Sequence, residues 1–256
     1  MEMLLDAKNV TMQFGGLKAV NAVDMEIRQG EIRALIGPNG AGKTTLFNVI
    51  SGIYIPTTGV VKFNGVDITK LRPHQVTALG IARTFQNVQL FDTLSSLENV
   101  MVGRHIRTKS GILATFIHTP RMKREEDLCR EKSKEMLEFV GLGRYESTLA
   151  GNLPYGRKRI LEIARALASE PKIIMLDEPC AGMNPSETEE LIQLIHKIRN
   201  SGVTVLLVEH NMRVAMGISD LVTVLDHGMK ICEGVPEVVQ NDPQVIEAYL
   251  GKEEAE

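Results

Sequence analysis

The sequence predicts an α/β fold in which helices cover both faces of a parallel sheet. From residue 160 onward, short apolar strands alternate with helical patterns, which is typical of such a sheet. Residues 4–36 have strand alternation and turn signals and predict an N-terminal antiparallel β-subdomain. From about 70 to 156 the pattern changes to helices and loops with little strand signal, which favours a helical lobe inserted in the α/β core.

The N-terminal elements follow from alternation and turn residues. "AVDMEI" alternates apolar and polar positions, and "VVKFNGVDI" predicts a hairpin with Asn64-Gly65 at its turn. Between them, the strand "IRALI" leads into a glycine-rich loop and then the helix "KTTLFNVIS", which Gly52 ends.

The second half repeats a helix and strand pattern. A helix over 160–169 is followed by the strand "KIIML". "NPSETEELIQLIHKIRNSG" predicts a helix with Asn184 as N-cap, Pro185 at the first helical position and Glu187 completing a capping box. The strand "VTVLLV" comes next.

Composition limits the function classes. The chain has 256 residues, 43% of them hydrophobic, enough for one large domain, 1–256, with an inserted lobe. Its formal net charge of −3 argues against a protein that lives on nucleic-acid phosphate. Three scattered cysteines predict neither a disulfide framework nor a metal site. An acidic start and no run of roughly 18 apolar residues predict neither a signal peptide nor a membrane span, so a membrane role would need a partner.

The first chemical motif is "GPNGAGKT", Gly37 to Thr44. It fits the phosphate-binding (Walker A) pattern and stands between a predicted strand and helix, the context that supports it. Glycines let successive backbone N–H groups converge on a polyphosphate. Lys43 would reach the β- and γ-phosphates, and the Thr44 hydroxyl would ligate Mg²⁺. The alternative is a tight glycine turn with an ordinary lysine.

The second motif is "KIIMLDEP". Its apolar residues place Asp177 at the carboxyl end of a buried strand, where an acid can hold the Mg²⁺ shell. Glu178 follows directly, and a carboxylate there can orient and polarise the attacking water. Without a phosphate loop upstream, both acids would be read as turn residues.

With both motifs in order, the chain resembles the ATP-binding subunit of an ABC transporter over nearly its whole length. The resemblance implies a P-loop ABC-type ATPase fold with an N-terminal antiparallel β-subdomain, an inserted helical subdomain at 87–156 and a second part of the core at 157–256. It also implies two subunits that enclose two ATP molecules, each between one chain's phosphate loop and the other chain's signature loop. The nucleotide-binding positions that it implies beyond Asp177 are Phe14, Val20, Asn39, Gly40, Ala41, Gly42, Lys43, Thr44 and Thr45, with Tyr155 and Gly156 in the signature loop.

Individual residues also take roles from the resemblance. Phe14 matches the aromatic that stacks on adenine, with Val20 lining the same pocket. Gln86 matches the glutamine that touches Mg²⁺ and water, and His210 the histidine that contacts the γ-phosphate. Catalytic roles are therefore expected for Glu178, His210 and Gln86, and metal contacts for Thr44, Gln86 and Asp177. Read alone, Phe14 would be a core or surface residue, Gln86 a surface residue and His210 structural.

Two loops depart from the family pattern. "LPYGR" stands where the family has Leu-Ser-Gly-Gly-Gln, so Pro154 removes the serine contact while Gly156 remains. Backbone N–H groups and the helix N-terminus still suit phosphate. The charges from Arg157 to Arg159 leave three interpretations: a nucleic-acid grip, a solvated helix start, or half of a partner's site. "CAGMN" replaces the usual Ser-Ala-Leu-Asp contact loop, and its Asn184 serves as a helix cap.

Residues 99–124 carry six basic side chains and no acid around the apolar "GILATFI". This stretch is either a solvated loop or a docking surface for a partner or anionic headgroups. The basic residues are Arg104, Arg107, Lys109, Arg121, Lys123 and Arg124.

More narrowly, "FGGLKAV", "GIARTFQNVQLF" and the ending "DPQVIEAYLG" resemble the larger ATP-binding subunit of branched-chain amino acid importers. This implies ATP hydrolysis that drives import through transmembrane permease subunits at the cytoplasmic face, with a second ATP-binding subunit and, indirectly, a substrate-binding protein. The alternatives are another cargo (urea or a lipid), a nucleic-acid-linked ATPase, and a GTPase or small-molecule kinase. The chain has no room for a coiled-coil insertion or tandem cassettes, and no N-K-x-D guanine motif.

Overall fold

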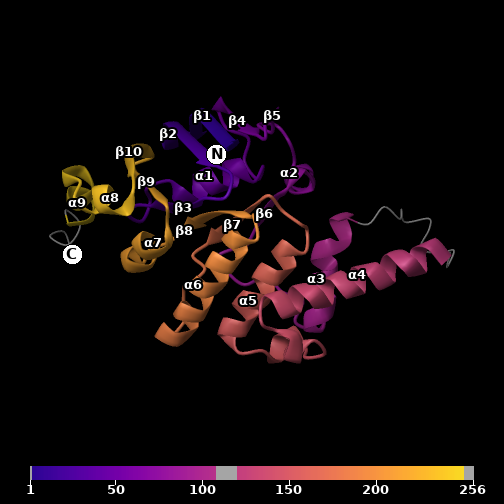
Figure 1. Ribbon diagram of the computed structural model, residues 1–256. Helices are drawn as coiled ribbons and strands as arrows, with labels where there is room; N and C mark the ends of the chain where they lie inside the picture. Colours follow the sequence, from indigo (N-terminus) through magenta and orange to yellow (C-terminus); the bar gives the residue numbers. More distant parts are fainter. Residues whose placement is uncertain (1, 108–119, 251–256) are drawn as a thin grey trace.

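The computed structural model describes residues 2–107 and 120–250, whose strands form two sheets (Figure 1). A four-stranded antiparallel sheet has the order β2-β1-β4-β5, and a six-stranded sheet has the order β10-β9-β3-β8-β7-β6. The strands are β1 (Met3–Phe14), β2 (Leu17–Arg28), β3 (Ile32–Ile36), β4 (Thr58–Phe63), β5 (Val66–Asp67), β6 (Ile81–Arg83), β7 (Ile173–Asp177), β8 (Thr204–Val208), β9 (Leu221–Asp226) and β10 (Met229–Gly234).

The six-stranded sheet is parallel except for its edge strand β10, which runs antiparallel to β9. Strands β3, β7 and β8 are buried at every residue, which explains why their sequences are mostly apolar and do not alternate. Because parallel strands share one carboxyl edge, the residues that follow them meet there. Gly37 follows β3, Asp177 ends β7, and His210 comes shortly after β8.

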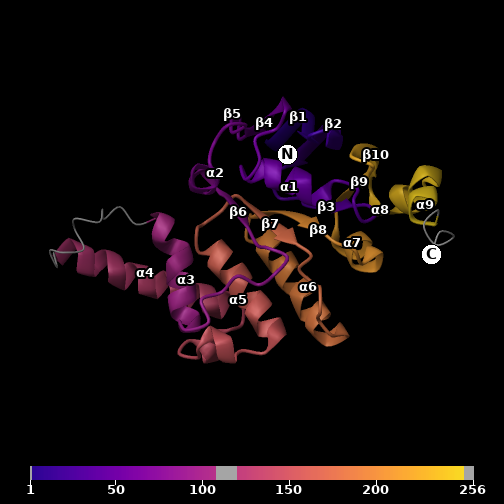
Figure 2. The ribbon, with the colours of Figure 1, turned by 180° about the vertical axis from the view of Figure 1, so that it is seen from behind.

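Helix α1 lies between the two sheets, and helices α5, α6 and α7 lie on the opposite face of the six-stranded sheet (Figures 1 and 2). Helices α3 and α4 extend away from the sheet on the side of α5 in both views. The helices are α1 (Lys43–Ile50), α2 (Pro73–Leu79), α3 (Ser96–Arg104), α4 (Pro120–Phe139), α5 (Tyr155–Leu167), α6 (Pro185–Asn200), α7 (Met212–Ile218), α8 (Pro236–Gln240) and α9 (Pro243–Leu250), with short 3₁₀ turns at His105–Arg107, Gly143–Tyr145 and Ala150–Asn152.

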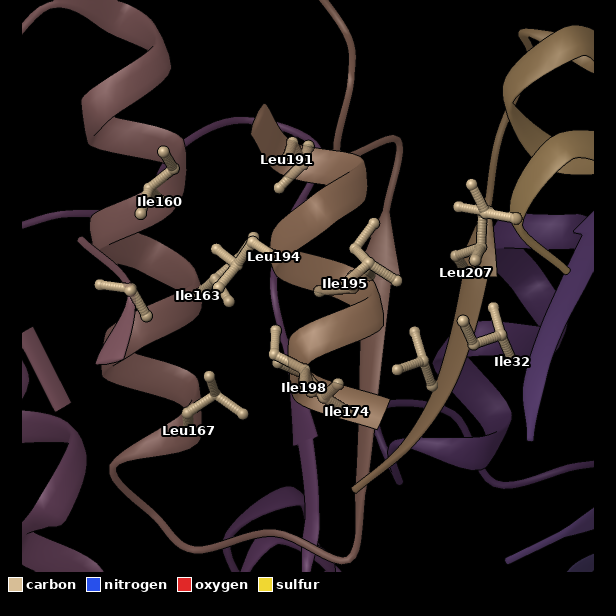
Figure 3. Close-up of a cluster of buried hydrophobic side chains, with 14 of the residues drawn as sticks. Ile32, Ile160, Ile163, Leu167, Ile174, Leu191, Leu194, Ile195, Ile198 and Leu207 are labelled. Atoms are coloured by element: carbon tan, nitrogen blue, oxygen red, sulfur yellow. The ribbon is translucent and has the colours of Figure 1, made fainter. Parts of the chain in front are cut away.

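The larger core fixes α5 against α6 and α6 against the sheet (Figure 3). Ile163 of α5 faces Leu194 of α6, while Ile195 on the other side of α6 faces the strands. Each fully buried aliphatic side chain of this kind contributes about 1.5–3 kcal/mol relative to exposure. The start of α5 is thereby held at a fixed position relative to the carboxyl edge of β7.

The structure confirms the predicted α/β fold class and most of its elements. The hairpin turns at Asn64-Gly65, and α6 begins with the predicted capping box at Asn184 and Glu187. The segment after residue 70, where little strand was expected, contains the strand β6, which has three residues and is too short for alternation to reveal. The subdomain limits 87–156 and 157–256 stay a prediction, and α5, which begins at Tyr155, crosses between them. In residues 2–107 and 120–250 no helix has the length and apolarity needed to cross a bilayer.

Candidate nucleotide-binding site

A cavity of about 470 Å³ opens at the carboxyl edge of the six-stranded sheet. It brings together segments from β1 and β2, the phosphate loop, and the turns after β6, β7 and β8. Its lining residues are Phe14, Ala19, Asn39, Gly40, Ala41, Gly42, Lys43, Thr44, Thr45, Gln86, Glu178 and His210. Most of the predicted nucleotide-binding residues thus surround one space.

The phosphate loop, residues 37–44, has the backbone that its glycines predict. Gly40 and Gly42 adopt φ angles of 80° and 99°, in the left-handed region that side chains disfavour. A Cβ on Gly42 would also collide with the backbone carbonyl of Ala19. Lys43 donates from Nζ to the carbonyls of Gly37 and Pro38 at 2.7 and 2.9 Å, so its ammonium lies within the loop at the start of α1. Loop amides, helix end and ammonium together make an anion site.

Gln86, Glu178 and His210 meet at the cavity wall. Gln86 donates from Nε2 to Glu178 Oε2 at 3.0 Å, and His210 Nε2 makes a short hydrogen bond with Glu178 Oε1. Glu178 has φ 48°, an uncommon conformation for a non-glycine residue, and its N–H donates to Val208 O at 2.9 Å. Such backbone outliers cluster at functional sites. Glu178 therefore contacts both of the other residues expected to be catalytic.

Asp177 lies in a different environment from Glu178. Its side chain is 4% exposed and forms an ion pair with Arg83, with 2.8 Å between Oδ2 and Nη2. Asp177 is not among the residues that line the cavity. No sequence motif predicts a role for Arg83, which stands three residues before Gln86. Among the described residues no three or more His, Cys, Asp or Glu side chains gather as a metal site.

The two residues expected around adenine differ. Phe14 lines the cavity, is 44% exposed and makes an edge contact with Tyr54, with 5.4 Å between ring centroids. Val20 does not line the cavity: it is fully buried in the core, and Ala19 lines the cavity instead, so a role of Val20 at adenine stays a prediction. Alternation along β2 turns the two neighbours to opposite faces.

The start of α5 places Tyr155 and Gly156 outside this chain's own cavity lining. Gly156 approaches the Glu187 side chain of α6, and Tyr155 lies near Gly182 in the "CAGMN" loop. In the same loop Cys180 donates its N–H to Glu209, and burial raises the pKa of its thiol well above the usual range. The signature loop and the contact loop are thus adjacent on one surface.

The three charges that open α5 are all paired within the chain. Arg157 forms an ion pair with Glu190 at 2.8 Å, and Lys158 a longer one with Asp92 at 3.7 Å. Arg159 is 2% exposed, which the sequence pattern did not predict. A row of free cations for nucleic acid is therefore not present at this helix.

Arg159 holds the segment that carries Gln86. It donates to the carbonyl oxygens of Phe85 (2.7 Å) and Gln86, and pairs with Glu162 at 3.2 Å. Glu162 in turn accepts from the N–H groups of Phe85 and Gln89. Burial raises the pKa of Glu162, and these N–H donors and Arg159 oppose that rise. This buried pair joins α5 to a segment more than seventy residues earlier in the chain.

The basic stretch 99–124 is only partly described. Arg104 pairs with Glu170 at 2.7 Å, and Arg107 donates to the carbonyls of Ser169 and Glu170. These two arginines bind the residues that directly follow α5, so they are not free docking charges. Lys123 and Arg124 are exposed on α4, the side chain of Arg121 is not described, and Lys109 and the apolar segment 111–117 lie outside the described residues.

This fold and cavity define a P-loop nucleoside triphosphatase. The sequence profile of the ABC transporter family matches residues 20–181, and that of the branched-chain amino acid ATP-binding cassette transporters matches 229–255. The high-affinity branched-chain amino acid transport ATP-binding protein of Pseudomonas aeruginosa is 44% identical over 97% of this chain and 98% of its own length. The chain belongs to the ABC transporter family, as an ATP-binding subunit.

Solved structures agree with this placement. The ADP conformation of an ATP-binding cassette of an ABC transporter has a TM-score of 0.86, 33% identity, and coverage of 98% of this chain and 100% of that one. A dimeric post-hydrolysis cassette bound to ADP and phosphate has a TM-score of 0.76 and 27% identity, covering 91% and 99%. The chain is therefore an ATPase whose hydrolysis is coupled to transport.

Proposed function

We propose that this chain hydrolyses ATP to drive the import of branched-chain amino acids through partner permeases at the cytoplasmic face of the membrane. The observation that carries the proposal is the contact of Gln86, Glu178 and His210 opposite the phosphate loop in one cavity. The cargo is the one named for the Pseudomonas aeruginosa relative and for the C-terminal family profile.

The proposed roles follow from position. Phe14 stacks on adenine, and residues 39–45 surround the phosphates with N–H groups and the Lys43 ammonium. Glu178 orients and polarises the attacking water, since its carboxylate lies at the cavity wall. Gln86 bonds to one oxygen of this carboxylate and His210 to the other, and together they fix its orientation. Catalysis of phosphoryl transfer is mostly positioning and charge stabilisation, which such an arrangement supplies.

The chain has suitable ligands for Mg²⁺. The Thr44 hydroxyl, the Asp177 carboxylate and the Gln86 amide offer hard oxygen donors, and few of them are needed, because Mg²⁺ in nucleotide sites keeps waters and substrate phosphates. The buried Asp177, with one oxygen held by Arg83, fits a metal-holding acid better than a surface turn residue. When bound, Mg²⁺ would neutralise charge on the β- and γ-phosphates.

A second ATP-binding subunit, identical or homologous, would complete each site. Tyr155 and Gly156 begin α5 without lining their own cavity, which supports a role on a partner's nucleotide. The helix N-terminus and its free backbone N–H groups favour a phosphate there. The related cassette seen as a dimer supports this arrangement.

The permeases would dock at a second cavity, of about 250 Å³, between β6, α3 and α5. Its wall includes Phe85, next to Gln86, and Val102 of the basic stretch, both exposed by 40% or more. Exposed apolar side chains around a hollow suit an apolar protein segment. A permease segment seated here would touch the residue adjacent to Gln86.

The test is reconstitution of the subunit with its permeases, its partner ATPase and an extracytoplasmic binding protein in vesicles. We expect ATP-dependent uptake of leucine, isoleucine or valine, and faster hydrolysis with loaded binding protein than by the isolated subunit. A complex carrying Glu178→Gln is the control. Uptake of urea or a lipid, with none of branched-chain amino acids, would refute the cargo and leave the ATPase intact.

A further inference from the structure

Arg83 ends β6 and makes contacts that neither the sequence motifs nor the proposed catalytic roles require. Its Nη2 bonds to Asp177 Oδ2 at 2.8 Å, and its Nη1 donates to Asn48 Oδ1 at 2.6 Å and Ser51 Oγ at 3.0 Å. The Arg83 side chain is 8% exposed and that of Asp177 4%. One guanidinium therefore joins the end of β7 to α1 and the residue after it.

Two aromatic rings fix the plane of this guanidinium. Its central carbon lies 5.5 Å from the ring centroid of Phe47 and 5.3 Å from that of Phe85. Arginine offers a rigid, planar set of donors that lysine cannot reproduce, so the geometry depends on the residue type. Arg83 and Phe85 also line the second cavity, so the same side chain reaches from that cavity to Asp177.

The elements that Arg83 joins are the ones that carry the proposed metal ligands. Thr44 stands in the first turn of α1, and Asp177 ends β7. Holding Oδ2 directs the other carboxylate oxygen, and anchoring to Asn48 sets the separation between α1 and β7. Outer partners of this kind orient ligating carboxylates and commonly change metal affinity 10–100-fold when removed.

We propose that Arg83 is a positioning residue that sets the Asp177 carboxylate for the divalent metal bound with ATP. This inference rests on the proposed metal role of Asp177. A merely structural ion pair would change stability when broken and leave metal affinity unchanged, so the two roles are separable by experiment.

The test measures Mn²⁺ binding by electron paramagnetic resonance, with the isolated subunit and a non-hydrolysable ATP analogue. We expect Arg83→Met to weaken Mn²⁺ binding by ~10-fold or more, and to raise the Mg²⁺ concentration for half-maximal hydrolysis similarly. Binding of metal-free ATP in the presence of a chelator should stay unchanged. Arg104→Met is the matched control, because it breaks an ion pair of similar length, at 2.7 Å, away from Asp177. Its metal dependence should equal that of the wild type.

Arg83→Lys keeps the charge and carries the test if Arg83→Met does not fold. One ammonium cannot replace the two separate guanidinium nitrogens, so we expect Arg83→Lys to lose Mn²⁺ affinity. Because the positive charge beside Asp177 remains, this loss should be smaller than in Arg83→Met. Wild-type Mn²⁺ affinity in a folded Arg83 variant would overturn the inference. Asp177→Asn separates the two levels of argument: if it also binds Mn²⁺ normally, the proposed role of Asp177 fails, and if it alone weakens binding, only the role of Arg83 fails.

Discussion

Replacing Arg159 tests whether this charge at the start of α5 stabilises the protein interior or binds an external ligand such as nucleic acid. Arg159→Met removes the guanidinium that donates to the carbonyl oxygens of Phe85 and Gln86. It also removes the cation that pairs with Glu162, and both side chains of that pair are 2% exposed or less. Removing one partner of a buried ion pair costs about 3–5 kcal/mol. We expect the free energy of unfolding to fall by about that amount.

The neighbouring charge is the matched control. Arg157 pairs with Glu190, but the two side chains are 27% and 48% exposed. A solvent-exposed pair contributes about 0–1 kcal/mol, so Arg157→Ala should change stability by no more than that. Urea denaturation of both variants, at one pH and ionic strength, measures the difference. Because Arg159 also holds the carbonyls beside Gln86, the hydrolysis rate of Arg159→Met should fall even where the protein is fully folded.

A second variant separates the lost pair from lost packing. Arg159→Met combined with Glu162→Gln removes both charges and leaves an amide oxygen for the N–H groups of Phe85 and Gln89. The double variant should regain part of the lost stability, since no unpaired buried charge remains. The stabilising role of the buried pair would be refuted if the free energy of unfolding of Arg159→Met lay within about 1 kcal/mol of the wild-type value. It would also be refuted if the main effect of Arg159→Met were a loss of RNA or DNA binding in a filter assay.

The remaining predictions concern the site and pH. Glu178→Gln should bind ATP normally but hydrolyse it ~10²-fold or more slowly in single-turnover measurements; a near wild-type rate would remove its role as base. Lys43→Ala should abolish binding of a fluorescent ATP analogue, and unchanged affinity would contradict the phosphate-loop assignment. Gly156→Asp should block the ATP-bound dimer in size-exclusion chromatography, by like charge against phosphate; Gly156→Ala, which meets the same Glu187 side chain without a charge, is its control. Burial raises the pKa of Glu162 above its unfolded value, so the folded state binds more protons than the unfolded state. The free energy of unfolding of Arg159→Met should therefore fall as pH rises from about 4.5 toward neutrality. A free energy of unfolding that does not change with pH would contradict this.

The elements that sequence predicted well are those whose signals are local. A capping box, an Asn-Gly turn and a glycine-rich loop each depend on residues within a few positions of one another. The strand ends could also be placed, because the four residues after Lys172 in "KIIML" are apolar and the next residue is Asp177. This is why the sequence predicts the phosphate loop and the two acids at the end of β7, Asp177 and Glu178. The structure brings Gln86 and His210 into contact with Glu178.

What the sequence could not supply depends on contacts between distant segments. Arg159 and Glu162 are three residues apart on a helix, the spacing of an ordinary surface pair, and only the segment around Phe85 makes them interior. Likewise, β6 has three residues, and its last one, Arg83, is held by Asp177 from a strand more than ninety residues later. Two buried guanidiniums thus hold the segment that carries Gln86. Arg83 anchors the end of β6 to Asp177, and Arg159 donates to the backbone carbonyls of Phe85 and Gln86. Since a strand this short cannot be fixed by its own propensity, the position of Gln86 depends on charge pairs with β7 and α5, the elements that carry the proposed metal-holding acid and the signature loop.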